Sequence, residues 1–217
     1  MAAKTLKRGF FITFEGPEGC GKSTHSKLLY EYLKAQGYTC VYTREPGGTK
    51  LGEAIRKVLL DSQGLDISDL SELLLFEAAR AQIVKEVIGP ALKDRAIVIS
   101  DRFGDATFAY QGYGGGLALK TIAAIDRFAT GGCVPGITIL LDIETSLGLA
   151  RATEKKADRM EEKALSYHSR VRRGYLKIAA KYPRRIKVIR VKGDIGKMQA
   201  SVRQEVERVL RKYKRPG

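Results

Sequence analysis

The stretch FFITFEGPEGCGKST, residues 10–24, sets the expected fold of this chain of 217 residues. It opens with a β-rich apolar run, and the residues from Gly16 to Ser23 then match the pattern G-x-x-x-x-G-K-[ST]. A helical pattern begins directly after the match, so the motif stands between a strand and a helix, which is the context that a phosphate-binding loop requires. A glycine-rich turn that matches by chance is the alternative, and this context disfavours it.

This loop is expected to bind ATP. Glycines let backbone N–H groups turn inward around an anion, and the following helix presents its unpaired N–H groups and positive dipole end to the same place. Lys22 is expected to reach the β- and γ-phosphates, and the Ser23 hydroxyl to hold Mg²⁺. The residues assigned to ATP are those of the loop and the helix start: Gly16, Pro17, Glu18, Gly19, Cys20, Gly21, Lys22, Ser23 and Thr24.

Four further β-rich apolar runs follow, at residues 40–43, 96–100, 137–142 and 186–191, with helical patterns between them. Alternating strands and helices favour an open, mainly parallel sheet with helices on both faces. Strands buried on both faces are continuously apolar, as these are. The length favours one domain over residues 1–217.

Two segments between the strands have a predicted shape. Residues 70–92 are rich in Leu, Ala and Glu, which predicts one long helix that ends near Gly89-Pro90. The run GYGGG, residues 112–116, is expected to be a flexible loop.

The net charge of +15 is unevenly distributed. Residues 1–150 carry 17 Lys and Arg against 17 Asp and Glu, whereas residues 151–217 carry 22 against 7. A surface with such an excess of positive charge attracts anions, which could be phosphorylated substrates or a nucleic-acid backbone. The alternative is that these charges only line solvated faces of helices. Three cysteines without a C-x-x-C pair suggest neither disulfides nor a zinc site and fit a reducing cytoplasm, and no apolar run is long enough to span a bilayer.

Two polar segments follow strand-like runs, where ligands bind in open α/β sheets. Asp101 can orient Mg²⁺, and the adjacent Arg102 can grip a phosphate with its bidentate fork, although an Asp-Arg surface turn is an equal alternative. The loop REPGGT at residues 44–49 is a natural ligand contact, or a turn and helix start with Thr49 as the N-cap.

Phe76 and Arg80 are four residues apart in the long predicted helix and therefore share one face. A ring beside a guanidinium suits a flat heterocycle, which the ring stacks on while the guanidinium donates to an exocyclic oxygen. A phenylalanine at helical spacing is more often part of the core, so this pair alone does not decide the acceptor.

Taken together, the segments FEGPEGCGKST, TREPGGT, LLLFEAARAQ, SDRF and AYQG, in this order, resemble the thymidylate kinase family over about residues 9–192. The phosphate-binding loop is generic, but the REPGGT segment together with DRF and AYQG is specific to that family. Two features vary within the family: Ala106 stands where members often have serine, and the loop lacks the arginine that some members carry there, as in the group that supplies charge from a lid.

The resemblance implies a three-layer α/β/α P-loop NTPase fold with a five-stranded parallel sheet, a short lid and usually a homodimer. It implies transfer of the γ-phosphoryl group of ATP to dTMP, with Mg²⁺ held by Ser23 and Asp101. By the same resemblance, Phe76 stacks on thymine, Arg80 meets its O4 edge, Thr107 meets N3, Arg102 holds the acceptor phosphate, Glu18 approaches the 3′-hydroxyl, Tyr110 occupies the space of a 2′-hydroxyl, and Glu45, Pro46 and Gln111 border the acceptor.

A charge-rich stretch, RATEKKADR at residues 151–159, is expected to be a mobile lid of about residues 151–160. Phosphoryl transfer needs in-line geometry, Mg²⁺ and cations that arrive on closure, and the candidates are Arg151, Lys155, Lys156 and Arg159. An exposed, salt-bridged helix end is the alternative.

Two other functions stay open at this point. The first is a kinase for another nucleoside or nucleotide, which would share the fold and the loop. The second is a basic nucleic-acid-binding ATPase, which the charge after residue 150 suggests but which no basic patch interleaved with aromatics supports.

Overall fold

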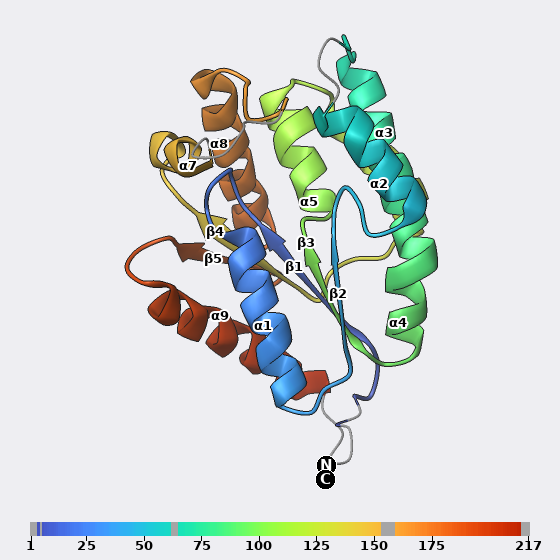
Figure 1. Ribbon diagram of the computed structural model, residues 1–217, viewed down its shortest axis with the longest axis vertical. Coiled ribbons are helices and arrows are strands. Elements are labelled where there is room, and N and C mark those ends of the chain that lie inside the picture. Colours follow the sequence, from blue (N-terminus) through green and yellow to red (C-terminus); the bar gives the residue numbers. More distant parts are fainter. Residues whose placement is uncertain (1–3, 5, 62–64, 153–158, 214–217) are drawn as a thin grey trace.

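The computed structural model describes residue 4 and residues 6–61, 65–152 and 159–213 of the chain. Its centre is a parallel five-stranded sheet in the order β2-β3-β1-β4-β5, drawn in Figure 1. The strands are β1 (Phe10–Glu15), β2 (Cys40–Arg44), β3 (Ile97–Asp101), β4 (Ile137–Asp142) and β5 (Ile186–Arg190). The five predicted runs and the parallel sheet are confirmed.

The three central strands are buried along their whole length, which is why their sequences are continuously apolar. Ile12 of β1 pairs with Ile99 of β3 and with Ile137 of β4, and all three side chains are buried. Because the strands are parallel, their carboxyl ends meet at one edge of the sheet. The loops that follow β1, β2 and β3 therefore converge there.

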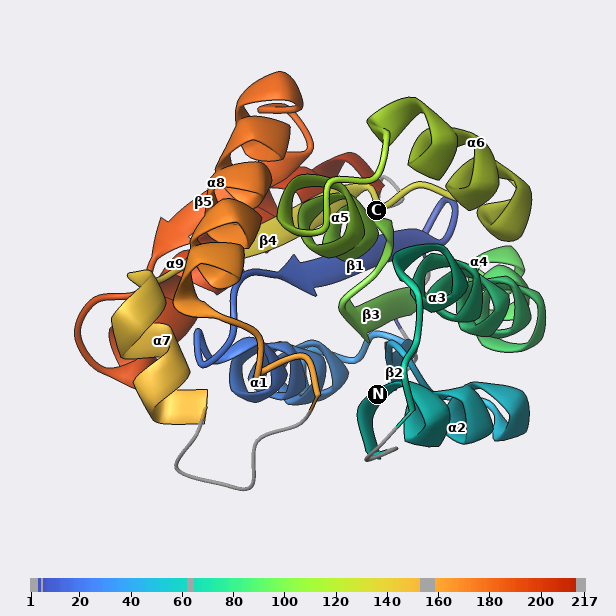
Figure 2. The same cartoon turned by 90° about the horizontal axis from the view of Figure 1, so that it is seen from above.

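Helices cover both faces of the sheet, as the view from above in Figure 2 shows. One face is covered by α1 (Lys22–Ala35) and α9 (Ile195–Leu210), and the other by α3 (Asp69–Ile83), α4 (Gly89–Lys93), α5 (Gly104–Thr107), α6 (Leu119–Thr130) and α8 (Leu165–Lys181). The remaining α-helices, α2 (Lys50–Arg56) and α7 (Thr145–Ala152), follow the loops after β2 and β4. This is the predicted three-layer α/β/α architecture. None of the helices within the described ranges is long and apolar enough to cross a membrane.

The long helix predicted over residues 70–92 is confirmed as one helical run, but it passes through Gly89-Pro90 instead of ending there. The helical run continues from α3 through the π-helical η2 (Val84–Ile88) into α4, which ends at Lys93. Pro90 lies in the first turn of α4, where a missing N–H is tolerated. A Cβ on Gly89 would lie 2.8 Å from the carbonyl oxygen of Val84, so glycine is required here by close packing rather than as a helix stop.

The expectation of a flexible loop at residues 112–116 is also wrong for its first half. Gly112 and Gly114 are buried in the π-helical η3 (Phe108–Gly114), which packs on α8. A Cβ on Gly114 would lie 2.8 Å from atoms of both Tyr167 and Val171, and the Gly114 carbonyl oxygen accepts hydrogen bonds from Arg170. The glycines here allow two helical segments to approach closely, which a single sequence does not distinguish from a loop signal.

Candidate active site

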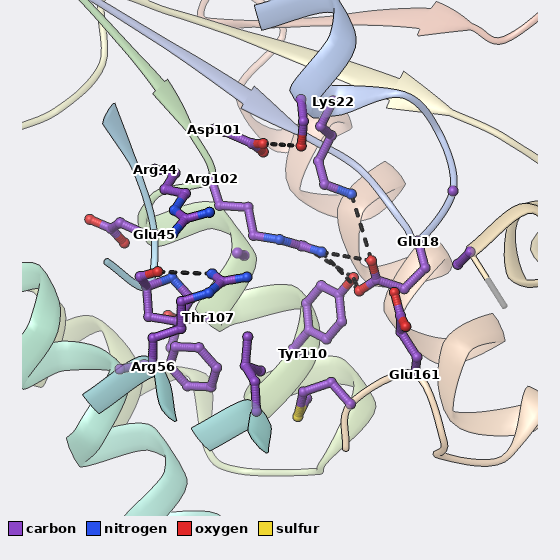
Figure 3. Close-up of a pocket in the computed structure, with 18 of the residues that line it drawn as sticks. Glu18, Lys22, Arg44, Glu45, Arg56, Asp101, Arg102, Thr107, Tyr110 and Glu161 are labelled. Carbon is purple, nitrogen blue, oxygen red and sulfur yellow. Dashed lines mark hydrogen bonds and ion pairs between the residues drawn. The ribbon is translucent and has the colours of Figure 1, made fainter. Parts of the chain in front are cut away.

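A cavity of about 460 Å³ opens at the carboxyl edge of the sheet. Its walls come from the loop after β1, the segments after β2 and β3, and the helices α2, α3 and η3, and Figure 3 shows the side chains that point into it. Most of the predicted site residues line this one cavity: Glu18, Gly19, Gly21, Lys22, Ser23, Thr24, Glu45, Pro46, Phe76, Arg80, Asp101, Arg102, Thr107, Tyr110, Gln111 and Arg151. Gly16, Pro17, Cys20 and Arg159 are described residues outside its lining, and Lys155 and Lys156 lie outside the described residues.

The loop between β1 and α1 has the geometry of a phosphate cradle. Gly16 and Gly19 adopt positive φ angles of 144° and 65°, and a Cβ on either would collide with backbone oxygens of Leu141 and Gly148. The Lys22 ammonium lies inside the loop and donates to the carbonyl oxygens of Gly16 at 2.9 Å and Pro17 at 2.8 Å. A lysine held at the start of a helix, with the helix dipole behind it, is suited to bind a polyphosphate.

Two oxygen-bearing side chains meet at the mouth of this cradle. The Ser23 hydroxyl, in the first turn of α1, donates a hydrogen bond to the Asp101 carboxylate at the end of β3. A hydroxyl and a carboxylate are hard oxygen ligands of the kind that Mg²⁺ prefers, and Mg²⁺ takes its other ligands from phosphates and water. The described residues contain no cluster of three or more His, Cys, Asp or Glu side chains that could hold a metal.

Glu18, Arg102 and Tyr110 form a closed hydrogen-bonded group across the cavity (Figure 3). Nη2 of Arg102 donates to both carboxylate oxygens of Glu18 at 2.8 Å, and the Tyr110 hydroxyl donates to the same carboxylate at 2.6 Å. Burial alone would raise the pKa of Glu18, but the neighbouring charges of Arg102 and Lys22 lower it to about 2. Glu18 is therefore ionised at neutral pH and holds the guanidinium and the phenol in one orientation.

Arg80 lies at the opposite wall, 1% exposed, and is surrounded by acids. Its guanidinium donates to Glu45 at 2.9 Å, Glu77 at 2.5 Å, Asp126 at 3.4 Å and the Thr107 hydroxyl at 2.9 Å. Burial alone would lower the pKa of Arg80, but the three carboxylates raise it above its ordinary range.

The pKa values of these three acids are shifted as well. Burial raises the pKa of Glu45 to about 7 and also raises that of Glu77 and Asp126, although Arg80 opposes all three shifts. Arg80 is therefore a permanently charged donor, and its ring of carboxylates fixes its direction.

Phe76 and Gln111 complete the acceptor side. Phe76 lines the cavity one helical turn before Arg80, and its other side packs on Ile55, Leu59 and Ala79. The two alternatives for Phe76, core residue and binding residue, are thus compatible in one position. Nε2 of Gln111 donates to the buried carboxylate of Glu72 at 2.8 Å, which fixes the direction of its amide.

The described C-terminal end of the predicted lid is tied to the acceptor side of the cavity. Nε of Arg159 donates to the Leu59 carbonyl oxygen at 2.8 Å, and its Nη2 is ion-paired with Glu72, the carboxylate that also binds Gln111. Arg151, at the end of α7, lines the cavity instead. The contribution of each lid cation to phosphoryl transfer stays a prediction.

Two cationic residues of the cavity were not assigned from the sequence. Arg44 ends β2 and pairs with Glu53, and Arg56 in α2 donates to the Pro46 carbonyl oxygen at 2.9 Å. The sequence did contain a pattern that points to Arg56. A helix capped at Thr49 places Gly52 and Arg56 four residues apart, and therefore on one face of that helix. A Cβ on Gly52 would lie 2.6 Å from the Gly47 carbonyl oxygen, so that face must lie against the loop after β2.

Comparisons with known proteins agree on one family. The thymidylate kinase family model matches residues 14–202. The thymidylate kinase of Symbiobacterium thermophilum is 45% identical over 208 residues, covering 95% of this chain and 97% of that relative, and that of Dehalococcoides mccartyi strain 195 is 46% identical over 201 residues, covering 93% and 97%. The crystal structure of thymidylate kinase from Ehrlichia chaffeensis superposes with a TM-score of 0.75 at 39% identity, covering 92% of this chain and 99% of that one.

Proposed function

The chain belongs to the thymidylate kinase family, and from this we propose which residues bind each part of the two substrates. The reaction itself is the transfer of the γ-phosphoryl group of ATP to dTMP, which gives ADP and dTDP. The same relatives disfavour both alternatives considered from the sequence, a kinase for another acceptor and a nucleic-acid-binding ATPase.

The donor triphosphate is bound by the loop of residues 16–23. The Lys22 ammonium exchanges the carbonyl oxygens of Gly16 and Pro17 for phosphate oxygens, which are stronger partners because they carry full charge. Ser23 and Asp101 hold Mg²⁺ there, and when bound the ion neutralises charge on the β- and γ-phosphates. The adjacency of these two oxygen ligands beside Lys22 supports this assignment.

The acceptor base lies between Phe76 and the Arg80 wall. Phe76 offers a ring face, while the fixed guanidinium of Arg80 donates toward O4 and the Thr107 hydroxyl lies 2.9 Å from that guanidinium, near N3. Gln111, Glu45 and Pro46 border the base. A buried, charge-locked donor favours a carbonyl oxygen over an amino group at that position, so thymine is preferred over cytosine.

The acceptor phosphate is bound by Arg102, with Arg44 and Arg56 adding positive charge on the side of α2. The phosphate of dTMP is already an anion, so transfer needs alignment and charge stabilisation more than a strong base. Glu18 approaches the sugar 3′-hydroxyl, and Tyr110 occupies the space of a 2′-hydroxyl. The lid cations Arg151, Lys155, Lys156 and Arg159 are the candidates to stabilise the transferred group; Arg151 lines the cavity, whereas Arg159 would first have to leave Glu72 and the Leu59 carbonyl oxygen. Closure of such a lid would also exclude water as a competing acceptor.

The assembly proposed is a homodimer in a reducing cytoplasm. Large apolar side chains are exposed on helices that pack on one another, namely Leu51 in α2, Leu70 and Leu74 in α3, and Phe128 in α6. Exposed apolar side chains on adjacent helices support a subunit contact there. Free Cys20, Cys40 and Cys133 fit a reducing compartment. Sedimentation of the purified chain at several concentrations checks the dimer.

One observation carries the acceptor assignment: Arg80 is buried and aimed by three carboxylates beside Phe76 in the cavity that also contains the loop lysine. The test is ADP release with dTMP, dUMP, dCMP, dGMP and UMP as acceptors. We expect the highest kcat/KM with dTMP and a large loss with dCMP. A preference for dCMP or dGMP over dTMP would contradict the assignment.

A further inference from the structure

Glu15 is a buried carboxylate that the proposed mechanism does not use. It ends β1, directly before the phosphate-binding loop, and its exposed fraction is 0%. Both of its oxygens are occupied: Oε1 accepts a hydrogen bond from the Phe103 backbone N–H at 2.7 Å, and Oε2 accepts one from the Tyr175 hydroxyl at 2.8 Å. One side chain thus joins β1, the segment after β3 and α8.

The first of these bonds bears on Arg102, the residue before Phe103. Arg102 has a φ angle of 74°, in a region that costs a side-chain-bearing residue free energy and persists only where the surroundings impose it. Its N–H donates to the Phe14 carbonyl oxygen at 2.9 Å, and its carbonyl oxygen accepts from the Ser100 hydroxyl at 2.7 Å. The bond from Phe103 to Glu15 is the third restraint on this short turn, and without it a buried N–H would have no partner.

The second bond bears on Tyr110. Tyr175 is 2% exposed, and its ring packs edge-on against the Tyr110 ring, with centroids 6.1 Å apart. The Tyr110 hydroxyl is in turn bonded to Glu18 and Arg102. Glu15 therefore restrains Arg102 through Phe103 and supports Tyr110 through Tyr175.

We propose that Glu15 and Tyr175 are positioning residues of the acceptor site, which hold the Arg102 turn and the Tyr110 ring where the acceptor nucleotide needs them. Neither side chain lines the cavity, so both act through their neighbours. The inference rests on the proposed role of Arg102 as the cation for the acceptor phosphate.

The test compares five variants with wild type, measuring kcat and KM for dTMP and for ATP and the unfolding midpoint. Glu15→Leu removes both bonds and should lower kcat/KM for dTMP about ten- to hundredfold, the cost of misplacing a reactive geometry by about 1 Å, while KM for ATP changes little. Glu15→Gln keeps an acceptor for Phe103 and a partner for Tyr175, and should stay within about threefold of wild type. Tyr175→Phe removes one hydroxyl and should cost about three- to tenfold. If Glu15→Leu fails to fold, Tyr175→Phe carries the test.

The matched control is Tyr32→Phe, which removes a tyrosine hydroxyl that bonds Glu207 between α1 and α9, away from the cavity. It should leave the dTMP parameters unchanged. Wild-type dTMP parameters in folded Tyr175→Phe and Glu15→Leu would overturn the inference, as would equal losses for ATP and dTMP, which indicate a general loss of structure. Arg102→Lys in the same assay tests separately whether Arg102 binds the acceptor phosphate. A large loss of kcat/KM for dTMP in Arg102→Lys, with no loss in the Glu15 and Tyr175 variants, would support that role of Arg102 and reject the positioning role of Glu15 and Tyr175.

Discussion

At the scale of single residues, the direction of a few buried polar groups sets what this cavity can bind. Tyr110 is 5% exposed, and its hydroxyl is shared between Glu18 and Arg102. Its ring cannot move aside without breaking both hydrogen bonds and losing its contact with Tyr175. A bound ligand with a substituent that overlaps the Tyr110 ring is therefore excluded, because the ring is held in place and cannot move to make room.

Tyr110→Ala should relax the discrimination between deoxyribose and ribose acceptors. Removing the ring opens space for a 2′-hydroxyl, so the ratio of kcat/KM for dTMP to that for its ribose analogue should fall about tenfold or more. The absolute rate with dTMP should also fall, because Arg102 loses one of its partners.

The matched control is Tyr113→Ala, in the same π-helical turn but outside the lining of the cavity. An unchanged ratio in Tyr110→Ala would assign the selection against ribose to another residue.

Residues in a continuous motif could be predicted, whereas those whose roles depend on long-range partners could not. Lys22 and Ser23 follow from eight consecutive letters in a strand-to-helix context. Of the acids around Arg80, Glu77 precedes it by three residues in α3, whereas Glu45 and Asp126 come from the loop after β2 and from α6, so no local pattern joins these two to Arg80. The same applies to Glu15, whose partners Phe103 and Tyr175 are 88 and 160 residues away.

At the scale of elements, the helix before the predicted lid lies directly against the phosphate-binding loop. A Cβ on Gly19 would lie 1.9 Å from the Gly148 carbonyl oxygen, and a Cβ on Gly148 would lie 2.5 Å from that of Glu18. The backbones of α7 and the loop therefore touch without side chains between them. A displacement of α7 at Gly148 would therefore also displace the phosphate-binding loop.

Gly148→Ala should separate α7 from the loop and weaken ATP binding. The added methyl overlaps a backbone oxygen and the Ile143 side chain, and overpacking of this kind costs about 1–3 kcal/mol. We expect KM for ATP to rise about tenfold, with a smaller change in KM for dTMP.

Gly196→Ala in α9 is the matched control, since the nearest atom to its added methyl is an Asp194 side-chain oxygen at 3.1 Å. Equal KM values for ATP in Gly148→Ala and wild type would show that the contact does not restrain the loop.

The strands and the order of elements could be predicted because each strand has an apolar run, which burial on both faces imposes in β1, β3 and β4, while β2 and β5 are only partly buried. The π-helical turns η2 and η3 could not, because their glycines have the same appearance in a sequence as loop glycines. Only the packing of η3 on α8 shows that Gly114 marks a place where α8 side chains lie directly against the η3 backbone. The division of the chain into one domain with a lid stays a prediction.

At the scale of the whole molecule, a buried acid beneath the site couples the stability of the fold to pH. Burial, with a contribution from Asp105, raises the pKa of Glu15 from 4.5 to about 8, although Arg102 and its two hydrogen bonds oppose the shift. The folded chain thus holds a proton on Glu15 that the unfolded chain releases above about pH 4.5. The contribution of protonated Glu15 to the free energy of unfolding is therefore fully present below about pH 4.5 and is lost as the pH rises toward 8.

Glu15→Gln should therefore gain stability relative to wild type as the pH rises from about 5 to about 8. Each unit of raised pKa corresponds to about 1.4 kcal/mol, so the difference in free energy of unfolding should grow by a few kcal/mol across this range. Urea unfolding of both proteins at each pH measures it. Taking the difference between wild type and Glu15→Gln removes the contributions of Glu45 and of other groups that titrate in both proteins. If the free energies of unfolding of the two proteins ran parallel with pH, Glu15 would be ionised in the folded chain.

One cavity is proposed to bind the ATP phosphates through Lys22 and to place dTMP in line with them. This is measured from the products that the purified chain forms from ATP, Mg²⁺ and dTMP, separated by anion exchange. We expect dTDP and ADP in equal amounts, a loss of at least about a hundredfold in Lys22→Ala with an unchanged unfolding midpoint, and full activity in Lys27→Ala, an exposed lysine of the same helix. ADP without dTDP, or dTDP formed equally well by Lys22→Ala, would contradict it.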